Sequence, residues 1–186
     1  MIVFYFACIY WGGVVLNALR IRKRTGKTPS LRPRLKVDVP LWIGWATIII
    51  LWAGAPWLGG AEGHFFQSHL ADLAGLVVAS AGLLGTWWCY ATLGDAWAIS
   101  QNKERTTTLV RKGPYGLMRH PIYSFQWLIL AGLFLYAPGL PLLVALVVLT
   151  ICMPIKARIE ERGLQDIFGA DYDQYAREVG RFVPGV

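Results

Sequence analysis

Residues 70–93 read LADLAGLVVASAGLLGTWWCYATL, an apolar run that contains no Lys or Arg. A helix needs about 20 mostly apolar residues to cross about 30 Å of hydrocarbon, so this stretch predicts a membrane-spanning helix. Gly75, Ala79, Gly82 and Gly85 place small side chains close to helical spacing along it. Small residues let a neighbouring backbone approach closely, so we expect this helix to pack tightly against another span.

Four other stretches have the same apolar character. Ile2 to Leu19 and Val39 to Leu58 are long enough to span a bilayer, whereas Pro121 to Ala137 and Gly139 to Ile155 are shorter. The two shorter stretches are joined by a proline-containing turn and predict an antiparallel helical hairpin. Of the 186 residues, 55% are hydrophobic, which is too apolar for an ordinary soluble domain. We therefore predict an all-α, polytopic membrane protein with five transmembrane helices.

The basic residues are confined to three segments of the chain. All 18 Lys and Arg residues lie there. They are Arg20, Arg22, Lys23, Arg24, Lys27, Arg32, Arg34 and Lys36 after the first stretch, Lys103, Arg105, Arg111, Lys112 and Arg119 after the third, and Lys156, Arg158, Arg162, Arg177 and Arg181 after the fifth. Because Lys and Arg stay on the cytosolic side of a membrane, this pattern predicts an N-terminus outside and a C-terminus in the cytosol. The net charge of +7 is then matched by anionic lipid headgroups, and we expect no nucleic-acid partner.

Three cysteines fall within the apolar stretches. Cys8, Cys89 and Cys152 have neither a CxxC spacing nor histidine neighbours. This pattern supports neither a disulfide framework nor a metal site, so we assign all three to packing.

The polar C-terminal tail reads as a continuation of the last span. Its pattern predicts a helix running on through Ile167, a break at Gly169, a second short amphipathic helix from Asp171 and a stop before Pro184. The predicted topology puts this tail and the connection from Gly94 to His120 on the same cytosolic face, where they are able to build one site.

The segment around His120 has two interpretations. Pro121 at the first position of a helix is typical of a helix start, and Arg119, His120 and Tyr123 surround it. These side chains are either an anchor at headgroup level with an aromatic belt, or part of a functional site.

A pair of carboxylates raises the same question. Glu160 and Glu161 follow an apolar helix, where carboxylates are costly unless paired or functional. Lys156 lies four residues before Glu160 and Arg158 three before Glu161, so solvated helix-surface pairs are the alternative.

The order of motifs in the second half of the chain resembles the catalytic half of isoprenylcysteine carboxyl methyltransferases and of the related phospholipid methyltransferase superfamily. The matching motifs are Leu93-Gly94 with Trp97, Leu109-Val110, Gly113-Pro114-Tyr115, Arg119-His120-Pro121-x-Tyr123, Glu160-Glu161-x-x-Leu164, Phe168-Gly169, Tyr172, Tyr175 and Arg181-Phe182-x-Pro184. The resemblance implies one membrane methyltransferase domain over residues 1–186, with three spans in 1–93 and a cofactor-binding catalytic half in 94–186.

The resemblance also implies a set of site residues. S-adenosylmethionine would be contacted by Gln101, Thr107, Thr108, Leu109, Val110, Tyr115, His120, Pro121, Ile122, Tyr123, Glu160 and Glu161. Arg119, His120 and Glu160 would be catalytic, and a substrate-facing cation of the family falls near Lys156 or Arg158. These residue types suit the cofactor, because carboxylates and aromatic faces hold its cationic groups.

The resemblance leaves the methyl acceptor open. A lipophilic acceptor entering from the bilayer is expected, first the carboxylate of an isoprenylated cysteine, with a phospholipid amine or a small thiol as alternatives. No Ser-His-Asp, Cys-His or metal constellation is visible in the sequence to deprotonate an amine or thiol, which favours a nucleophile that is already ionised. A non-catalytic membrane scaffold or sensor is the alternative from another class of protein. Sterol reductases share a similar C-terminal pattern, but the chain lacks room for their additional spans.

Overall fold

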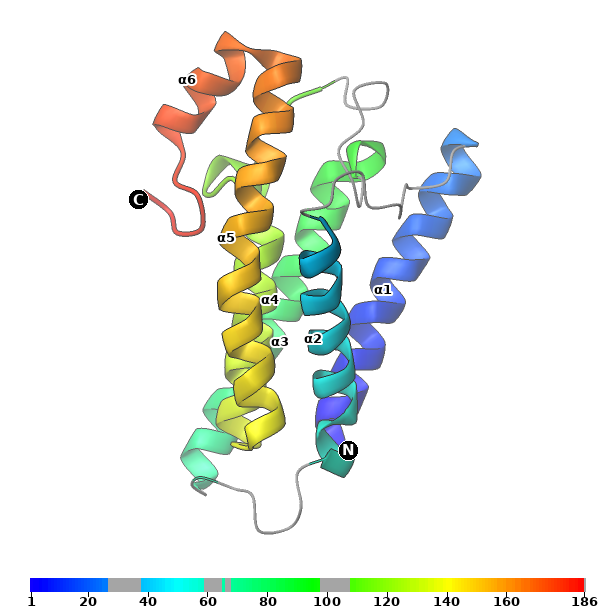
Figure 1. The fold of residues 1–186 in the computed structure, drawn as a ribbon, viewed down its shortest axis with the longest axis vertical. Helices are drawn as coiled ribbons and strands as arrows, with labels where there is room; N and C mark the ends of the chain where they lie inside the picture. The colour runs from blue at the N-terminus through cyan, green and yellow to red at the C-terminus, as the bar shows by residue number, and fades with distance from the viewer. Residues whose placement is uncertain (27–37, 59–64, 66–67, 98–107, 186) are drawn as a thin grey trace.

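The computed structural model describes residues 1–26, 38–58, 65, 68–97 and 108–185. Within them the chain forms α1 (Ile2–Thr25), α2 (Asp38–Leu58), α3 (His69–Leu93), α4 (Pro121–Tyr136), α5 (Leu140–Phe168) and α6 (Ala170–Glu178), with short 3₁₀ turns η1 (Gly94–Ala96) and η2 (Gly113–Gly116). The long helices run along a common axis (Figure 1). No β-strand occurs in these ranges, so the predicted all-α class is confirmed.

The lengths of the helices refine the predicted count of five spans. Among the described residues, α1, α2, α3 and α5 are each long and apolar enough to cross a membrane. The fourth predicted stretch is α4, an apolar helix of 16 residues, which at 1.5 Å per residue is about 24 Å long and shorter than the hydrocarbon core. The fifth helix is longer than the predicted span, because α5 continues for 29 residues to Phe168. The hairpin therefore has one short arm and one long arm.

The closest helix contact joins α3 to α4 through glycines. A Cβ atom at Gly75 would lie 2.5 Å from the carbonyl oxygen of Gly132, and one at Gly132 would lie 2.5 Å from the backbone nitrogen of Ala79. A Cβ atom at Gly82 would lie 2.7 Å from the carbonyl oxygen of Phe125. The small residues noted in the sequence thus form the predicted close contact, and α4 is their partner.

The remaining long helices pack through larger side chains. On the other side of the bundle α2 lies against α5, and α1 leans away from the bundle towards its basic end (Figure 1). Ile48, Trp52 and Leu149 are fully buried in the core between them. Cys89 and Cys152 are buried as predicted, but Cys8 is exposed on α1, so the assignment of that cysteine to packing was wrong.

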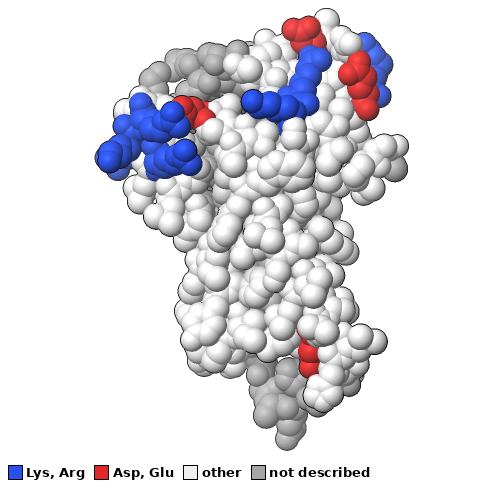
Figure 2. Space-filling model, turned by 180° about the vertical axis from the view of Figure 1, so that it is seen from behind, with Lys and Arg blue, Asp and Glu red and all other residues white. Residues whose placement is uncertain are grey.

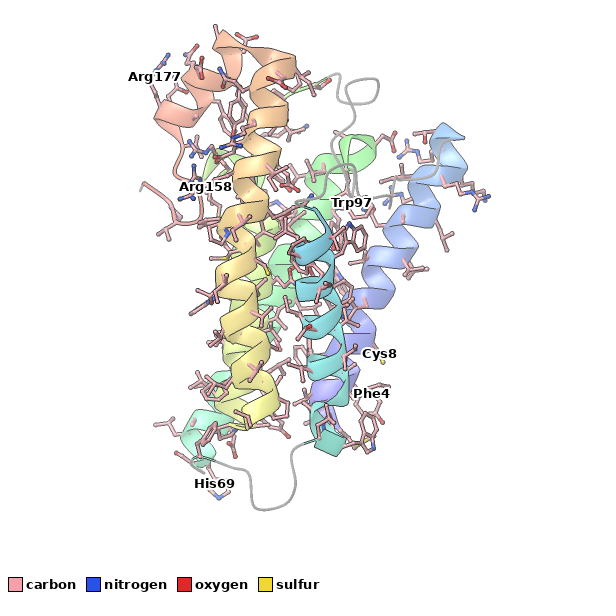
Figure 3. All side chains as sticks on the ribbon, viewed as in Figure 1. Phe4, Cys8, His69, Trp97, Arg158 and Arg177 are labelled. Atoms are coloured by element: carbon pink, nitrogen blue, oxygen red, sulfur yellow. The ribbon has the colours of Figure 1, made fainter. Side chains whose placement is uncertain are left out.

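The surface has an apolar middle and a charged end. On the face shown in Figure 2, Lys and Arg gather at one end of the molecule and a long uncharged zone follows. Large apolar side chains such as Leu16, Ile50 and Leu84 are exposed on the long helices. His69 lies at the end opposite to Arg158 and Arg177 (Figure 3). A broad exposed apolar band of this kind is the expected surface of a protein that lies in a bilayer.

The predicted break in the tail is confirmed at Gly169. Its φ of 53° lies in the left-handed region, which favours glycine, and its N–H donates to the carbonyl of Gln165 at 2.8 Å. The turn folds α6 back beside the end of α5 (Figure 1).

Candidate functional site

Two segments far apart in the sequence build the frame of the site. The backbone N–H of Arg119 donates to the carbonyl of Gly180 at 2.8 Å, and that of His120 donates to the carbonyl of Arg181 at 3.0 Å. The hydroxyl of Ser124 donates to the carbonyl of Phe182 at 2.7 Å. His120 precedes Pro121 at the start of α4, so these bonds fix the imidazole at the helix N-terminus.

A cluster of titratable side chains surrounds His120. Its Nδ1 lies 3.5 Å from Oε2 of Glu160, and its Nε2 lies 3.3 Å from Oε1 of Glu161. The hydroxyl of Tyr123 donates to Oε1 of Glu160 at 2.8 Å, and the ring of Tyr123 stacks on the imidazole with centroids 5.8 Å apart. The two adjacent glutamates of α5 therefore hold opposite nitrogens of one histidine.

Glu160 and Glu161 differ in the basic side chains that they contact. Glu161 is bound by Arg181 through Nε at 2.9 Å and Nη2 at 2.6 Å, and Nη2 of Arg119 lies 3.2 Å from its Oε1. Among the described residues, Glu160 has one cationic neighbour besides His120, namely Lys156, whose Nζ lies 3.8 Å from Oε1. The alternative of solvated helix-surface pairs does not fit, because the side chains of Glu160 and Glu161 are only 16% and 13% exposed.

The pKa of the His120 imidazole is set by two opposing effects. Burial lowers the pKa of His120, but its hydrogen bonds to Glu160 and Glu161 and their negative charges outweigh burial and hold that pKa above the ordinary value of 6.5. The hydrogen bonds from Arg181 to Glu161 likewise raise the pKa of this arginine. The protonated histidine is thus favoured between the two carboxylates.

The cluster opens into a cavity of about 440 Å³. Part of its wall comes from the second half of the chain, namely Thr108, Leu109, Val110, Tyr115, Arg119, His120, Pro121, Ile122, Tyr123, Gln126, Lys156, Glu160, Leu164 and Tyr175. The rest comes from α1, α2, α3 and η1, namely Tyr10, Trp11, Val14, Leu41, Trp42, Trp45, Ile49, Tyr90, Leu93, Ala96 and, just after η1, Trp97. One region of the cavity is therefore polar and titratable, and another is aromatic and apolar.

Most of the predicted site residues meet at this cavity. Of the residues assigned from the resemblance, Gln101 and Thr107 lie outside the described part of the chain. Glu161 and Arg158 are described but do not line the cavity. Glu161 is occupied by two arginines and His120, and Arg158 is exposed on α5 (Figure 3).

Sequence reasoning missed several residues of the site. The N-terminal helices were expected to supply only spans, yet Tyr10, Trp11 and Trp45 line the cavity. Gln126 was also missed, although a glutamine inside an apolar helix is a visible signal. The hydroxyl of Tyr175 donates to the carbonyl of Tyr115 at 2.6 Å and supports the cavity wall from α6.

The fold and site together define a class of protein: a helical membrane protein with a ligand-sized cavity at the charged end of its bundle. The model of the phospholipid methyltransferase family matches residues 70–171. This match covers more than half of the chain, and the chain belongs to that family.

The chain is similar in sequence to two curated proteins. The protein-S-isoprenylcysteine O-methyltransferase of Saccharomyces cerevisiae is 35% identical over 88 residues, covering 46% of this chain and 36% of that protein. The cobalt-zinc-cadmium resistance protein CzcN of Cupriavidus metallidurans is 33% identical over 110 residues, covering 58% of this chain and 50% of that protein. The chain thus spans half or less of the length of these curated relatives.

A solved structure shares the fold. The eukaryotic intramembrane Ras methyltransferase, isoprenylcysteine carboxyl methyltransferase, superposes with a TM-score of 0.57 over 84% of this chain and 55% of that chain, at 18% sequence identity. The predicted resemblance to this group of membrane methyltransferases is confirmed.

Proposed function

We propose that the chain transfers a methyl group from S-adenosylmethionine to a lipophilic acceptor, and that the first candidate acceptor is the carboxylate of an isoprenylated cysteine. The observation that supports this proposal is the two-part cavity. Glu160, His120 and Tyr123 form its polar region, and Trp45 and Ile49 belong to its apolar wall. A volume of about 440 Å³ is within the range of small-molecule sites.

The donor set suits S-adenosylmethionine. This cofactor would supply an electrophilic methyl group on a sulfonium. Glu160 is the carboxylate of the cavity wall, and Tyr115 and Tyr123 add aromatic rings, so the cavity carries the groups that hold sulfonium and ammonium cations. Arg119 and Lys156 also line it and suit the carboxylate of the cofactor.

The surroundings of His120 favour an acceptor that is already ionised. Both of its ring nitrogens face carboxylates, so the imidazole has no free nitrogen to take a proton from an incoming amine or thiol. A carboxylate acceptor needs no such base. The role of His120 in this proposal is to orient Glu160 at the cavity wall.

We further propose that the cavity faces the cytosol, with the N-terminus outside. The basic residues at the cavity end of the bundle, such as Arg24, Lys112 and Arg158, support this orientation. Within the membrane, the acceptor would enter laterally through the apolar wall.

Methyl transfer by the purified protein in lipid vesicles tests the proposal. The protein is given S-adenosylmethionine with a labelled methyl group and N-acetyl-S-farnesylcysteine, with N-acetylcysteine as the soluble control. We expect a base-labile methyl ester on the farnesylated compound and little on the soluble one. Methyl transfer to phosphatidylethanolamine or to a small thiol instead would show that one of these compounds is the acceptor. If the protein does not bind S-adenosylmethionine at all, the alternative of a non-catalytic scaffold or sensor is favoured.

A further inference from the structure

Gln126 is a buried polar residue inside an apolar helix. It lies one turn after Tyr123 on the same face of α4, and it lines the cavity. The side chain is 1% exposed, and within the described chain its Nε2 has no hydrogen-bond partner. A buried amide nitrogen without a partner is costly, because nothing replaces the hydrogen bond that water would provide.

A second N–H group of the cavity wall is in the same situation. Nε1 of Trp11, on α1, is buried and likewise lacks a partner among the described residues. Tyr123 and Thr86, by contrast, have partners, since Tyr123 donates to Glu160 and Thr86 donates to the carbonyl of Gly82. Nε1 of Trp52 also lacks a partner among the described residues, but Trp52 does not line the cavity. Two uncharged donors are therefore left in the part of the cavity that is otherwise aromatic and apolar.

We infer that Gln126 Nε2, together with Trp11 Nε1, donates hydrogen bonds to an uncharged carbonyl oxygen of the methyl acceptor. This inference rests on the proposed function and adds a feature of the substrate: an amide or ester carbonyl next to its reacting group. An uncharged oxygen fits better than an anion, because both donors are neutral.

Gln126 is thus a specificity-determining residue. A site built to hydrogen-bond a substrate group rejects the analogue that lacks it, because the buried donor is then left unpaired. The position of Gln126 one turn deeper than Tyr123 would place this carbonyl on the membrane side of the Tyr123 and Glu160 pair.

Two acceptors that differ in the acetamido group that bears this carbonyl test the inference. N-acetyl-S-farnesylcysteine carries an amide, and S-farnesyl-3-thiopropionic acid has the same carboxylate, thioether and chain without it. We expect the unmodified protein to prefer the amide compound by about five- to tenfold in kcat/KM. Gln126→Met keeps the length of the side chain and removes one of the two donors, so most of the preference should be lost with the Kd for S-adenosylmethionine unchanged.

Two further variants control for packing. Trp11→Phe keeps the aromatic contacts and removes the second donor, so it should lower the preference partly, even if Gln126→Met fails to fold. Thr86→Val removes a buried hydroxyl outside the cavity and should leave the preference intact. An unchanged preference in both Gln126→Met and Trp11→Phe would overturn the inference.

A binding measurement separates this inference from the proposed function. The rise in unfolding temperature caused by each farnesyl compound is measured in detergent without S-adenosylmethionine. If neither compound is methylated, but the amide compound stabilises the unmodified protein more than Gln126→Met, the proposed function fails and the carbonyl site stands. Equal stabilisation of the unmodified protein by the two compounds, with no preference in turnover, would refute the carbonyl site.

Discussion

The guanidinium of Arg181 binds the carboxylate of Glu161 through two hydrogen bonds, of 2.9 Å from Nε and 2.6 Å from Nη2. This bidentate pair ties the C-terminal segment to α5, and Glu161 in turn holds His120. Glu160, its neighbour in sequence, instead lines the cavity. Successive helix residues point about 100° apart, which is why adjacent glutamates serve such different surroundings.

Glu160→Gln should therefore weaken cofactor binding, whereas Glu161→Gln should lower stability. Glu160→Gln removes the carboxylate at the cavity wall, so we expect the affinity for S-adenosylmethionine to fall about ten- to a hundredfold, or about 1.5 to 3 kcal/mol. Glu161→Gln leaves Arg119 and Arg181 without their anion and should instead lower stability by about 3 kcal/mol. Calorimetric titration and thermal unfolding of both variants measure the two effects. Equal losses of affinity at normal stability would show that both carboxylates bind the cofactor.

Arg181→Gln should release the C-terminal segment. The loss of both hydrogen bonds to Glu161 should destabilise the protein by about 1 to 2 kcal/mol. Arg181→Lys keeps the positive charge but not the two parallel N–H donors of the guanidinium, so it should destabilise the protein less. Arg177→Gln is the matched control, since Arg177 is exposed on α6 and its replacement should change stability by less than about 0.5 kcal/mol. Chemical denaturation in detergent measures all three. Equal effects at the two positions would contradict a structural role for the pair.

The raised pKa of His120 predicts a pH dependence. The protonated imidazole lies between Glu160 and Glu161, so its contribution to stability is complete below its ordinary value of 6.5 and is lost as the pH rises through the raised pKa of the folded protein. The difference in unfolding temperature between the unmodified protein and His120→Gln should therefore shrink with rising pH. Melting curves from about pH 6 to about pH 9 measure this difference. A difference that grows with pH would contradict the assignment.

Gly132→Ala should disrupt the contact between α3 and α4. Its new methyl group would meet the backbone of Ala79 and Gly75 at 2.5 Å, and we expect a loss of about 1 to 3 kcal/mol. Gly12→Ala in α1 is the control, because nothing lies within 4 Å of its Cβ position and alanine favours a helix. Thermal unfolding of the two variants compares them directly. The same stability in both would mean that α3 and α4 are able to separate at no cost.

Orientation is tested by cysteine labelling. In a protein without Cys8, Cys89 and Cys152, a cysteine at His69 should react with an impermeant reagent outside the cell, and one at Lys112 should not. Both positions are exposed in the structure. Labelling at Lys112 with protection at His69 would reverse the proposed topology.

Much of the fold was readable from the sequence because a bilayer imposes simple rules. Apolar length predicted the helices, and small residues predicted the close contact at Gly75 and Gly82. The continuation of α5 beyond its apolar run was also predicted, to Ile167, and the helix ends one residue later, at Phe168. Hydropathy alone does not register this continuation, which was predicted from the helix-stop signal at Gly169.

Only part of the site was predicted from the sequence. Motif order drew attention to His120, Tyr123 and Glu160, which meet at the cavity. Helix geometry also favoured Glu160 over Glu161 at the cofactor, because successive residues point about 100° apart. The pairing of Glu161 with Arg181, twenty residues later in the chain, was not predictable in this way. The aromatic wall from α1 and α2 was missed, since Trp11 and Trp45 look like ordinary interfacial residues until helix packing turns them inward.

The backbone pairing of residues 118–120 with residues 180–181 has a consequence for how the protein is made. During synthesis, α1 to α4 emerge and enter the membrane before the segment that holds His120 exists. The ribosome must complete α5 and α6 before that histidine is fixed between its two carboxylates. A nascent chain arrested before Gly180 should therefore contain inserted helices in which the backbone N–H groups of Arg119 and His120 still lack their acceptors, so the order of translation makes the start of α4 the last part of the site to be fixed.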